Sequence, residues 1–592
     1  MNEINKHIKQ IRKWIQINDL DAFIIPHDDE YLSEYIPPEN ERLAWASGFT
    51  GSAGTAIIKK DDATIFVDGR YTVQVKQQVD DKIYEICHLA NTPLIKWMKN
   101  NLKKESRLGY DPRLHRVNWV QSMSKILKNQ VHLIPMYENP TDLHWENRPK
   151  PSHDKALLLN LKYAGLSSEK KRINMGNIIT KNKCDAAFLT KLDSIAWVLN
   201  IRGNDVPCNP VLLSHGLMHA DGAFDLFINE SKIPKGFHNH VGKNVNVHPS
   251  KNIKNILHKF SGKKIQLDFK NSNAWSHDMI IDSGALIINK DDPCTLPKAC
   301  KNDNEIQGMK NCHIRDAIAV CTFLSWLDQK VNDKEMLDEG TLSDKLDSNR
   351  ADLDLFKGIS FGTISAAGKN AAMCHYNHKN QDIPSTLEMN SIYLVDSGGQ
   401  YLDGTTDITR TVAIGKPNEF MKKMFTLVLK GHISLGSCRF PEGIAGQHLD
   451  TFARQYLWHH GYDFDHGTGH GVGSYLNVHE GPHGIGKGAN NVPLHPGMVV
   501  SNEPGYYEEN SFGIRCENLI LVKEIEKVNG KKLLGFEDLT LVPFDHRLMS
   551  MDMLNQSDIE WINGYHKDVW KKISPLVNGN VKTWLKNATK GI

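Results

Sequence analysis

The sequence predicts an α/β (α+β) protein built from several domains, and three observations carry that prediction. The chain has 592 residues, which is too long for one hydrophobic core. Hydrophobic residues make up 40% and charged residues 24%, as in ordinary globular domains. Helix-like and strand-like stretches alternate over the first 300 or so residues, which is typical of layered α/β folds.

The first domain is expected over residues 1–140. Four isoleucines near the N-terminus recur at helical spacing and predict an amphipathic helix. Short apolar runs at residues 22–25, 54–58 and 64–67 lie between turn residues and predict strands. Prolines among polar residues then interrupt both kinds of element, which places a boundary near residue 140.

A second α/β domain is expected over residues 141–297, with a strand at 285–288 and a proline-containing, charged segment at its end. The third domain, residues 298–592, opens with a predicted helix at 305–331. It closes with another helix, for which Ser557 and Glu560 form an expected capping box. The residues expected on the buried side of that last helix are Ile562, Tyr565, Val569 and Ile573.

Charge and hydropathy exclude several classes of partner. Lys plus Arg (71) nearly balances Asp plus Glu (69), so no basic field is present to hold nucleic acid. No apolar run approaches the roughly 20 residues of a membrane helix, and no membrane partner is expected. The N-terminus lacks the pattern of a signal peptide, so a cytoplasmic protein is expected. The ten cysteines show no CxxC pair, and most are expected to be buried thiols.

Histidines gather in one part of the third domain. Seven of the 28 lie within residues 459–495, where an even spread would place about two. His459, His460 and His495 are expected on the surface. His466 and His470 differ, because the four glycines of HGTGHGVG (residues 466–473) let the backbone crowd a small object beside them.

The segment HEGPH (residues 479–483) matches the HExxH string of zinc peptidases, but the match fails physically. That motif needs an α-helix to bring both histidines to one face, and Gly481 and Pro482 would lie inside it. His479 and His483 are therefore not expected to act as a zinc pair. For His483 a surface or loop position is expected.

Four acids follow or lie in apolar strand-like segments. Asp396 follows residues 392–395, and Asp407 lies in the strand DITRTV after a predicted turn, so a hairpin would bring the two together. Glu503 and Glu517 form a second such pair. A single acid at a turn is usually solvated, but four at strand ends in a domain with a glycine-flanked histidine favour a site.

Convergence of the four acids would require cations. Unit charges about 4 Å apart repel by roughly 4 kcal/mol at an effective dielectric near 20, so an empty cluster would take up protons or unfold. Two divalent metal ions would balance four carboxylates. Oxygen ligands with one imidazole suit Mn, Co or Zn, which predicts a two-metal hydrolase site.

Five motifs, in their order along the chain, resemble the pita-bread metallopeptidases, specifically the three-domain Xaa-Pro aminopeptidases called aminopeptidase P. The motifs are LVDSGGQYLDGTTDITRT, HGTGHGVG, VHEGPHG, SNEPGYY and GIRCENL. Residues 44–74, the segment LTKLDSIAWVLNIRGNDVPCNPV and the segment KNDNEIQGMKNCHIRDA extend the resemblance to nearly the whole chain. The resemblance implies a C-terminal pita-bread catalytic domain preceded by two creatinase-like α/β domains.

The resemblance also implies a role for each matching residue. Asp396 would bind one metal ion, Asp407 and Glu517 would bridge both, and His470 and Glu503 would bind the other. The family's usual metal is manganese. The other implied roles are Glu503 as general base, His375, His466 and His479 as substrate-site histidines, His479 as the donor to the scissile carbonyl, and Arg515 as a donor that holds a bridging carboxylate.

The implied activity is release of the N-terminal residue from peptides with proline second. Prolidase and methionine aminopeptidase share the fold, but the two extra N-terminal domains argue against both. A catalytically dead, peptide-binding relative would have lost ligands, and none is missing here. The family also implies a homodimer through the catalytic domain.

Overall fold

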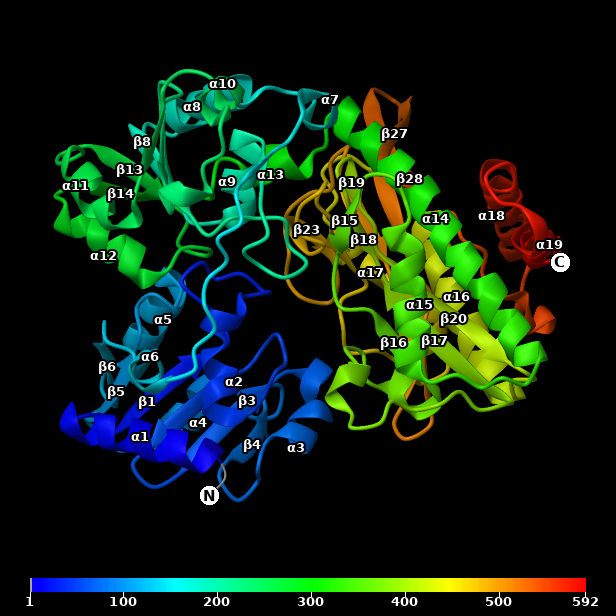
Figure 1. Cartoon of the computed structure of the whole chain (residues 1–592), viewed down its shortest axis with the longest axis horizontal. Coiled ribbons are helices and arrows are strands. Elements are labelled where there is room, and N and C mark those ends of the chain that lie inside the picture. The colour runs from blue at the N-terminus through cyan, green and yellow to red at the C-terminus, as the bar shows by residue number, and fades with distance from the viewer. Residues whose placement is uncertain (1–2) are drawn as a thin grey trace. The chain divides into compact units, whose positions relative to one another are not determined.

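The computed structural model describes residues 3–592, and these fall into two compact units (Figure 1). The first contains residues up to Asn160 together with Leu166–Thr295. The second contains Leu161–Gly165 and Leu296–Ile592. Among the helices of residues 3–592, none has both the length and the hydropathy needed to cross a bilayer. The ten cysteines are thiols outside any disulfide, and six of them are buried, as expected.

The first unit begins with a six-stranded sheet in the order β4-β3-β2-β1-β5-β6. Its strands are β1 (Ala22–Pro26), β2 (Thr55–Lys59), β3 (Ala63–Val67), β4 (Glu85–His88), β5 (Ser106–Tyr110) and β6 (Val131–Pro135). Its helices are α1 (Glu3–Ile17), α2 (Arg42–Ser47), α3 (Gln74–Gln78), α4 (Leu94–Asn101), α5 (Val117–Leu127) and α6 (Pro140–His144). The predicted amphipathic helix is α1, which buries Ile8, Ile11 and Ile15.

A second sheet of six strands, in the order β12-β11-β10-β8-β13-β14, repeats the topology of the first. In each sheet the first strand is central, the next two strands are antiparallel neighbours, and the last two run parallel on the other side. The strands are β8 (Ala186–Leu189), β10 (His215–His219), β11 (Phe224–Phe227), β12 (Val245–His248), β13 (Lys264–Leu267) and β14 (Leu286–Asn289). The helices are α8 (Ser168–Lys181), α9 (Leu192–Leu199), α10 (Phe237–Val241), α11 (Ile253–His258) and α12 (Ala274–Asp282), and β7 (Leu157–Leu158) pairs with β9 (Ile201–Arg202). The sequence shows no fixed-period repeat, so this duplication is visible in the structure alone.

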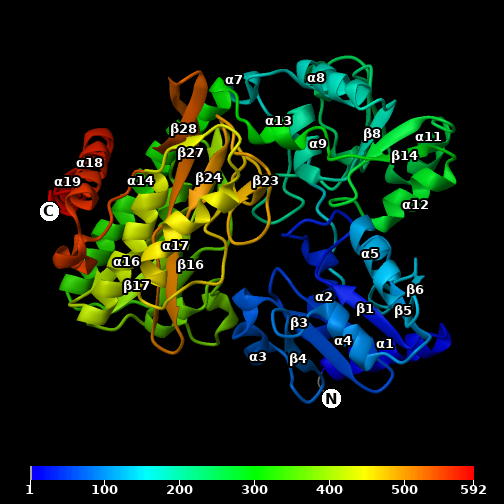
Figure 2. The same cartoon turned by 180° about the vertical axis from the view of Figure 1, so that it is seen from behind.

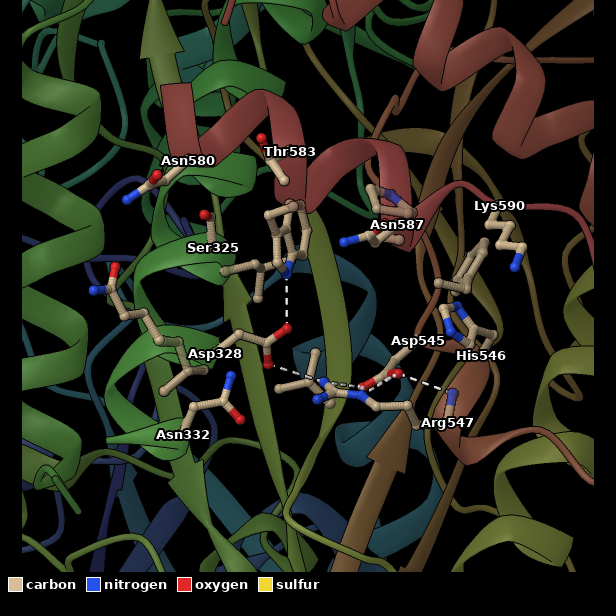
Figure 3. A pocket seen from close by; sticks show the side chains of 18 residues that line it. Ser325, Asp328, Asn332, Asp545, His546, Arg547, Asn580, Thr583, Asn587 and Lys590 are labelled. Carbon is tan, nitrogen blue, oxygen red and sulfur yellow. Dashed lines mark hydrogen bonds and ion pairs between the residues drawn. The ribbon is translucent and has the colours of Figure 1, made fainter. Parts of the chain in front are cut away.

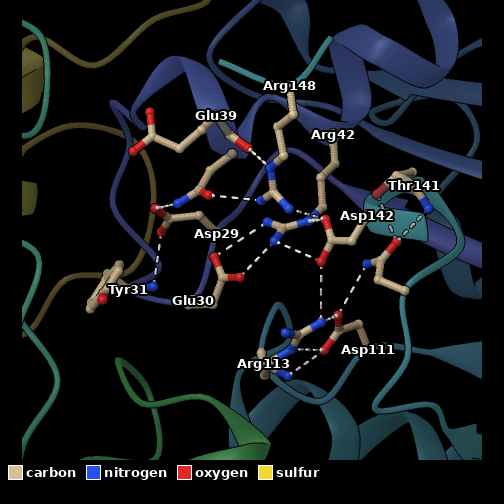
Figure 4. Close-up of polar contacts among 12 residues, drawn as sticks. Asp29, Glu30, Tyr31, Glu39, Arg42, Asp111, Arg113, Thr141, Asp142 and Arg148 are labelled. Atoms are coloured by element: carbon tan, nitrogen blue, oxygen red, sulfur yellow. Dashed lines mark hydrogen bonds and ion pairs between the residues drawn. The ribbon is translucent and has the colours of Figure 1, made fainter. Parts of the chain in front are cut away.

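A buried arginine organises the loop after β1 in the first unit (Figure 4). The Arg42 guanidinium donates to Glu30 at 2.6 Å and to Asp142 at 2.7 Å. Asp142 also lies 3.0 Å from Arg148 and 3.5 Å from Arg113, so one carboxylate in α6 joins three arginines. The amide of Asn273 donates to the Glu30 carbonyl at 2.7 Å, which ties the same loop to the second sheet's domain.

The second unit contains a six-stranded sheet in the order β21-β28-β27-β24-β22-β23 and smaller sheets, among them β16-β17-β20 and β15-β18-β19. Its strands are β15 (Phe356–Ile359), β16 (Ile364–Ala367), β17 (Ser391–Ser397), β18 (Gly399–Tyr401), β19 (Gly404–Thr405), β20 (Ile408–Ile414), β21 (Phe440–Pro441), β22 (Gly469–Gly471), β23 (Glu480–Ile485), β24 (Val499–Asn502), β25 (Gly505–Glu508), β26 (Phe512–Arg515), β27 (Asn518–Val528) and β28 (Lys531–Asp538). Antiparallel pairing joins β17 to β20 and β24 to β27, which places the ends of four strands close together.

Helices flank these sheets. They are α14 (Asp303–Asn332), α15 (Glu339–Ala351), α16 (Glu419–Gly436), α17 (Asp450–Trp458), α18 (Gln556–Ile573) and α19 (Gly579–Ala588), preceded by α13 (Thr295–Ala299) at the border between the units. Helices α14 and α15 lie toward the viewer in Figure 1, and α16 and α17 lie in front in the reverse view of Figure 2. The predicted long helix is α14, and its first turn is closed by a capping box between Asn302 and Glu305.

The start of α18 corrects one prediction. The capping box is formed by Asn555 and Asp558, not by Ser557 and Glu560, so the helix begins with Gln556. Asn at the N-cap accepts from the third backbone N–H as well as Ser does, and it stands two residues earlier. The buried side of the helix, which includes Ile562 and Tyr565, is as predicted.

Candidate metal centre

Asp396 and Asp407 lie at one end of the β17–β20 pair. Asp396 lies within β17, opposite Thr409 of β20, and Asp407 directly precedes β20. The two strands therefore bring the acids together, as the predicted hairpin required. The residues between them were expected to form a turn, but they form β18 and β19, which pair with each other and with β15.

Glu503 and Glu517 lie at the end of the β24–β27 pair. Glu503 directly follows β24, and Glu517 directly precedes β27. Asn502 pairs with Asn518, so the two acids are neighbours across the pair. Glu517 is only 2% exposed and Asp396 only 8%.

His470 stands in β22 between the two acid pairs. Its Nε2 lies 3.4 Å from Asp407 Oδ2 and 3.4 Å from Glu503 Oε1. Asp407, His470 and Glu517 each offer one ligand atom within 4.8 Å of the others, as a shared metal ion would require. A Cβ on Gly471 would lie 2.1 Å from the Glu480 carbonyl oxygen, so only glycine allows this close approach of β22 to β23.

The electrostatics of the cluster favour a cation. Burial, opposed by Arg515 and reinforced by Asp407, raises the pKa of Asp396 to about 6. Burial and the charges of Asp407 and Asp396 raise the pKa of Glu517 well above its ordinary value. Burial alone would lower the pKa of His470, but hydrogen bonding to Asp407 and the charge of Glu503 raise it to about 9. Negative charge from neighbouring acids contributes to all three shifts, in addition to the larger effect of burial on the two acids.

One carboxylate oxygen of the cluster has no hydrogen-bond partner. Asp396 Oδ1 is buried and accepts no hydrogen bond, although its other oxygen lies 2.5 Å from Arg515 Nη2. Buried carboxylate oxygens in native proteins are almost always satisfied. The orphaned oxygen, the four acids and the single imidazole fit divalent metal ions that prefer oxygen ligands.

Arg515 lies behind the acids and contacts three groups of the site. Besides Asp396, it donates to the Thr409 hydroxyl at 3.0 Å and to the Tyr507 hydroxyl at 2.7 Å. Thr409 in turn donates to Glu517 at 2.7 Å. Arg515 was expected to be a donor that holds a bridging carboxylate; it donates to Asp396, and Thr409 connects it to Glu517.

His466, His479 and His375 lie in the same unit as the cluster. The His479 ring packs edge-on against the His470 ring with centroids 4.2 Å apart. His466 Nε2 lies 2.8 Å from the Tyr507 hydroxyl. Burial, assisted by Arg515, lowers the pKa of His466 to about 3, and a protonated His375 would act in the same direction. His375 therefore lies close enough to His466 to affect its charge.

Three residues of the site were not predicted from the sequence: Tyr507, Thr409 and Ser501. Tyr507 touches both His466 and Arg515, and the Ser501 hydroxyl donates to Glu503 at 2.9 Å. Thr409 lies two residues from Asp407 in sequence, and Ser501 and Tyr507 lie two and four residues from Glu503. The period of two in a strand points such residues to the face that carries the acid, which was the available signal.

His483 was expected at the surface, and that prediction is wrong. Its side chain is 3% exposed and lies in β23, where Nε2 donates to the Val499 carbonyl at 2.9 Å. Burial, together with Lys301, lowers the pKa of His483 to about 4. The rejection of a zinc pair is confirmed, because residues 480–485 of this segment form a strand. His459 and His460 are exposed as expected, whereas His495 is half-buried.

A cavity of about 600 Å³ lies on the opposite face of β20 (Figure 3). Val412 lines it, whereas Thr409 contacts Glu517, and the alternation of a strand points the two side chains to opposite faces. Three of its charged groups pair with one another, since Arg547 donates to Asp328 and Asp545. This cavity is therefore separate from the metal centre.

Family models match most of the chain. Residues 307–524 match metallopeptidase family M24, and residues 532–592 match the C-terminal region of peptidase M24. Two further segments, residues 7–138 and 147–305, match creatinase/prolidase N-terminal domains. The two matches of the latter kind correspond to the duplicated sheets of the first unit.

Relatives and solved structures agree with these matches. A probable Xaa-Pro aminopeptidase P of Aspergillus fumigatus is 38% identical over 99% of this chain and 92% of its own length. One from Ajellomyces capsulatus is 38% identical over 100% and 99%. The X-prolyl aminopeptidase of Caenorhabditis elegans, described as a cytosolic enzyme with a di-nuclear active site, superimposes with a TM-score of 0.95 at 32% identity, with both chains fully covered.

A Bacillus anthracis Xaa-Pro dipeptidase shares the fold over 64% of this chain and 99% of its own, with a TM-score of 0.51 and 22% identity. These findings confirm the expected pita-bread domain and the two creatinase-like domains before it. The chain therefore belongs to metallopeptidase family M24, among the Xaa-Pro aminopeptidase P proteins.

Proposed function

We propose that this chain is a metal-dependent aminopeptidase that hydrolyses the N-terminal Xaa–Pro bond of peptides and releases the first amino acid. The observation that carries the proposal is the 38% identity to Xaa-Pro aminopeptidase P proteins over 99% of the chain. A buried cluster of acids and histidine stands in the matching domain. Proline at the second position explains a dedicated enzyme, because its tertiary amide offers no N–H to ordinary peptidases.

The cluster suits two divalent metal ions, and manganese is the metal we propose. Asp396 would hold one ion, Asp407 and Glu517 would contact both, and His470 and Glu503 would hold the other. When bound, such ions polarise the scissile carbonyl and make a water molecule more acidic. The orphaned oxygen of Asp396 and the shared reach of Asp407, His470 and Glu517 support this assignment.

The remaining steps belong to side chains of this chain. Glu503 is proposed as the general base that takes the proton of the attacking water, with one oxygen oriented by the Ser501 hydroxyl. His479 is proposed to donate to the scissile carbonyl oxygen as negative charge develops there. His466 is neutral near pH 7, since its pKa lies near 3, and it would contact substrate as an uncharged imidazole. His375 would complete the substrate site beside it.

Three further statements are part of the proposal. The protein would act in the cytoplasm, and it would form a homodimer through the catalytic domain. The two domain borders would fall near residues 140 and 297. The second of these is close to the division of the two units between Thr295 and Leu296.

The alternatives are a prolidase-like dipeptidase and a catalytically dead relative that binds peptides. Purified protein refilled with Mn should be offered Arg-Pro-Pro, Ala-Pro and Met-Ala-Ser side by side. We expect release of arginine from Arg-Pro-Pro as the preferred reaction. Cleavage of Ala-Pro alone would indicate a dipeptidase, and cleavage of Met-Ala-Ser a methionine aminopeptidase. Binding of Arg-Pro-Pro without turnover would indicate the dead relative.

A further inference from the structure

The proposed reaction leaves the glutamate of the HEGPH segment (residues 479–483) unused. Glu480 is fully buried, yet it faces two lysines that are each only 1% exposed. Lys298 Nζ lies 2.6 Å from one carboxylate oxygen, and Lys301 Nζ lies 2.5 Å from the other. Because each oxygen has its own ammonium partner, rotation of the carboxylate is restrained at both ends.

The backbone of Glu480 is held as firmly as its side chain. Glu480 pairs with Gly471 of β22, the strand that carries His470. A Cβ on Gly471 would lie 2.1 Å from the Glu480 carbonyl oxygen and 2.5 Å from His483 Cε1. His483 crosses over this glycine and donates to Val499 of β24. The HEGPH segment is therefore fixed against both strands that lead to the candidate ligands His470 and Glu503.

His479 directly precedes Glu480, and its ring contacts the His470 ring with centroids 4.2 Å apart. Whatever holds Glu480 therefore limits where the His479 ring can lie. Lys301 is itself fixed, because its backbone N–H donates to the Gly497 carbonyl just before β24.

We propose that Glu480, clamped between Lys298 and Lys301, is a positioning residue that holds His479 at the metal centre. This inference rests on the proposed function, in which His479 donates to the scissile carbonyl. Any other conformation of Glu480 that broke one of these buried ion pairs would leave an uncompensated charge. The clamped conformation is therefore strongly favoured. An apolar contact would hold the strand without direction, whereas two charged hydrogen bonds fix an orientation.

The test is a double-mutant comparison on Arg-Pro-Pro with Mn-loaded enzyme. Lys301→Met should lower kcat by about tenfold or more with KM changed less than about twofold, because small displacements of a catalytic donor cost rate. Placed on His479→Ala, the same change should alter kcat by less than about twofold, since the residue through which it acts is gone. Metal content should stay unchanged in each variant.

Lys430→Met is the matched control. It also removes a buried ammonium from the second unit, where Lys430 pairs with Asp558 at the start of α18. Its contacts are with Tyr456, Met553 and Asp558 rather than with residues 479–483, so kcat should stay within about twofold in both backgrounds. Lys301→Arg keeps the charge, so its kcat should fall less than that of Lys301→Met.

Several outcomes would overturn the clamp. Equal losses of kcat from Lys301→Met with and without His479 would show that the lysine acts through the metal ligands or the fold. An unchanged kcat in the Lys301→Met single variant would show that no positioning occurs. A wild-type rate in His479→Ala would show that His479 has no catalytic role, and the clamp would then have no catalytic residue to position.

A readout independent of activity separates this inference from the proposed function. In metal-free protein, amide exchange of residues 478–485 should quicken by about tenfold or more in Lys301→Met, because local opening no longer breaks both ion pairs. Lys430→Met should instead affect α18. Unchanged exchange at residues 478–485 refutes the clamp even if the enzyme is active. Faster exchange in a protein that cannot cleave Arg-Pro-Pro would refute the proposed function and leave the clamp without a catalytic role.

Discussion

Asp407 and Glu517 are the single residues whose loss should be most informative. Asp407→Asn and Glu517→Gln each keep the shape of the side chain and remove one negative charge from a proposed bridging ligand. We expect each to lose at least one metal ion per chain and about a hundredfold or more in turnover. Elemental analysis and kcat should be measured on the same preparations.

The matched control for these variants is Asp403→Asn. Asp403 is also a buried carboxylate of the second unit, but it pairs with Arg315 rather than with the acids of the site. Its loss should reduce stability and leave the metal content unchanged. Full metal content and near-normal turnover in Asp407→Asn would mean that the ligands have been misassigned.

At the scale of the element, the N-terminus of α18 separates a true cap from an apparent one. The Asn555 side chain accepts from the Asp558 backbone N–H at 2.9 Å, whereas the Ser557 hydroxyl donates to Asn555. Asn555→Ala should cost about 1 kcal/mol of helix stability, which is about fivefold faster amide exchange in the first turn of α18. Ser557→Ala serves as the control and should change exchange by less than about twofold. A larger effect on exchange from Ser557→Ala than from Asn555→Ala would instead support the capping box of Ser557 and Glu560 that was predicted from the sequence.

The elements also show what could be predicted from sequence. The strands that carry Asp396, Asp407, Glu503 and Glu517 were predictable, because apolar runs with acids at their ends are local patterns. The burial of His483 was not, since it depends on packing against Gly471 and Val499, which lie in two other strands. The partners of Glu480 were hidden for the same reason, as Lys298 and Lys301 lie about 180 residues away in sequence.

At the scale of the whole molecule, metal binding should be coupled to protons. Without metal, the pKa of His470 lies near 9, that of Asp396 near 6, and that of Glu517 well above its ordinary value. Each group must lose its proton to act as a ligand. A raised pKa means that the proton is held as pH rises to that value, so metal affinity should increase from pH 6 to about 9.

Calorimetry at pH 7 in two buffers with different ionisation enthalpies would measure the number of protons released per Mn bound. We expect about one or more, mainly from His470, whose pKa lies above the pH of the experiment. The control is Asp403→Asn, which should release the same number. No release, together with an affinity that does not depend on pH, would contradict the electrostatics described for the cluster.

The whole molecule also contains a duplication that no sequence period revealed. The two six-stranded sheets of the first unit share one topology. Their strands are short and their helices differ in length and sequence, so similarity persists in the backbone path after it has faded from the residues. Fold can be kept by many apolar sequences that preserve volume and pattern.

The spread of the proposed metal ligands along the chain has a consequence for protein synthesis. Asp396 and Glu517 stand 121 residues apart, and the last of them is residue 517 of 592. A ribosome must therefore translate the chain through Glu517, and Glu517 must leave the exit tunnel, before all the proposed ligands can meet. The two domains of the first unit can fold earlier, since domains generally fold as units in the order of their synthesis. Metal capture then becomes one of the last events in the maturation of a newly made chain.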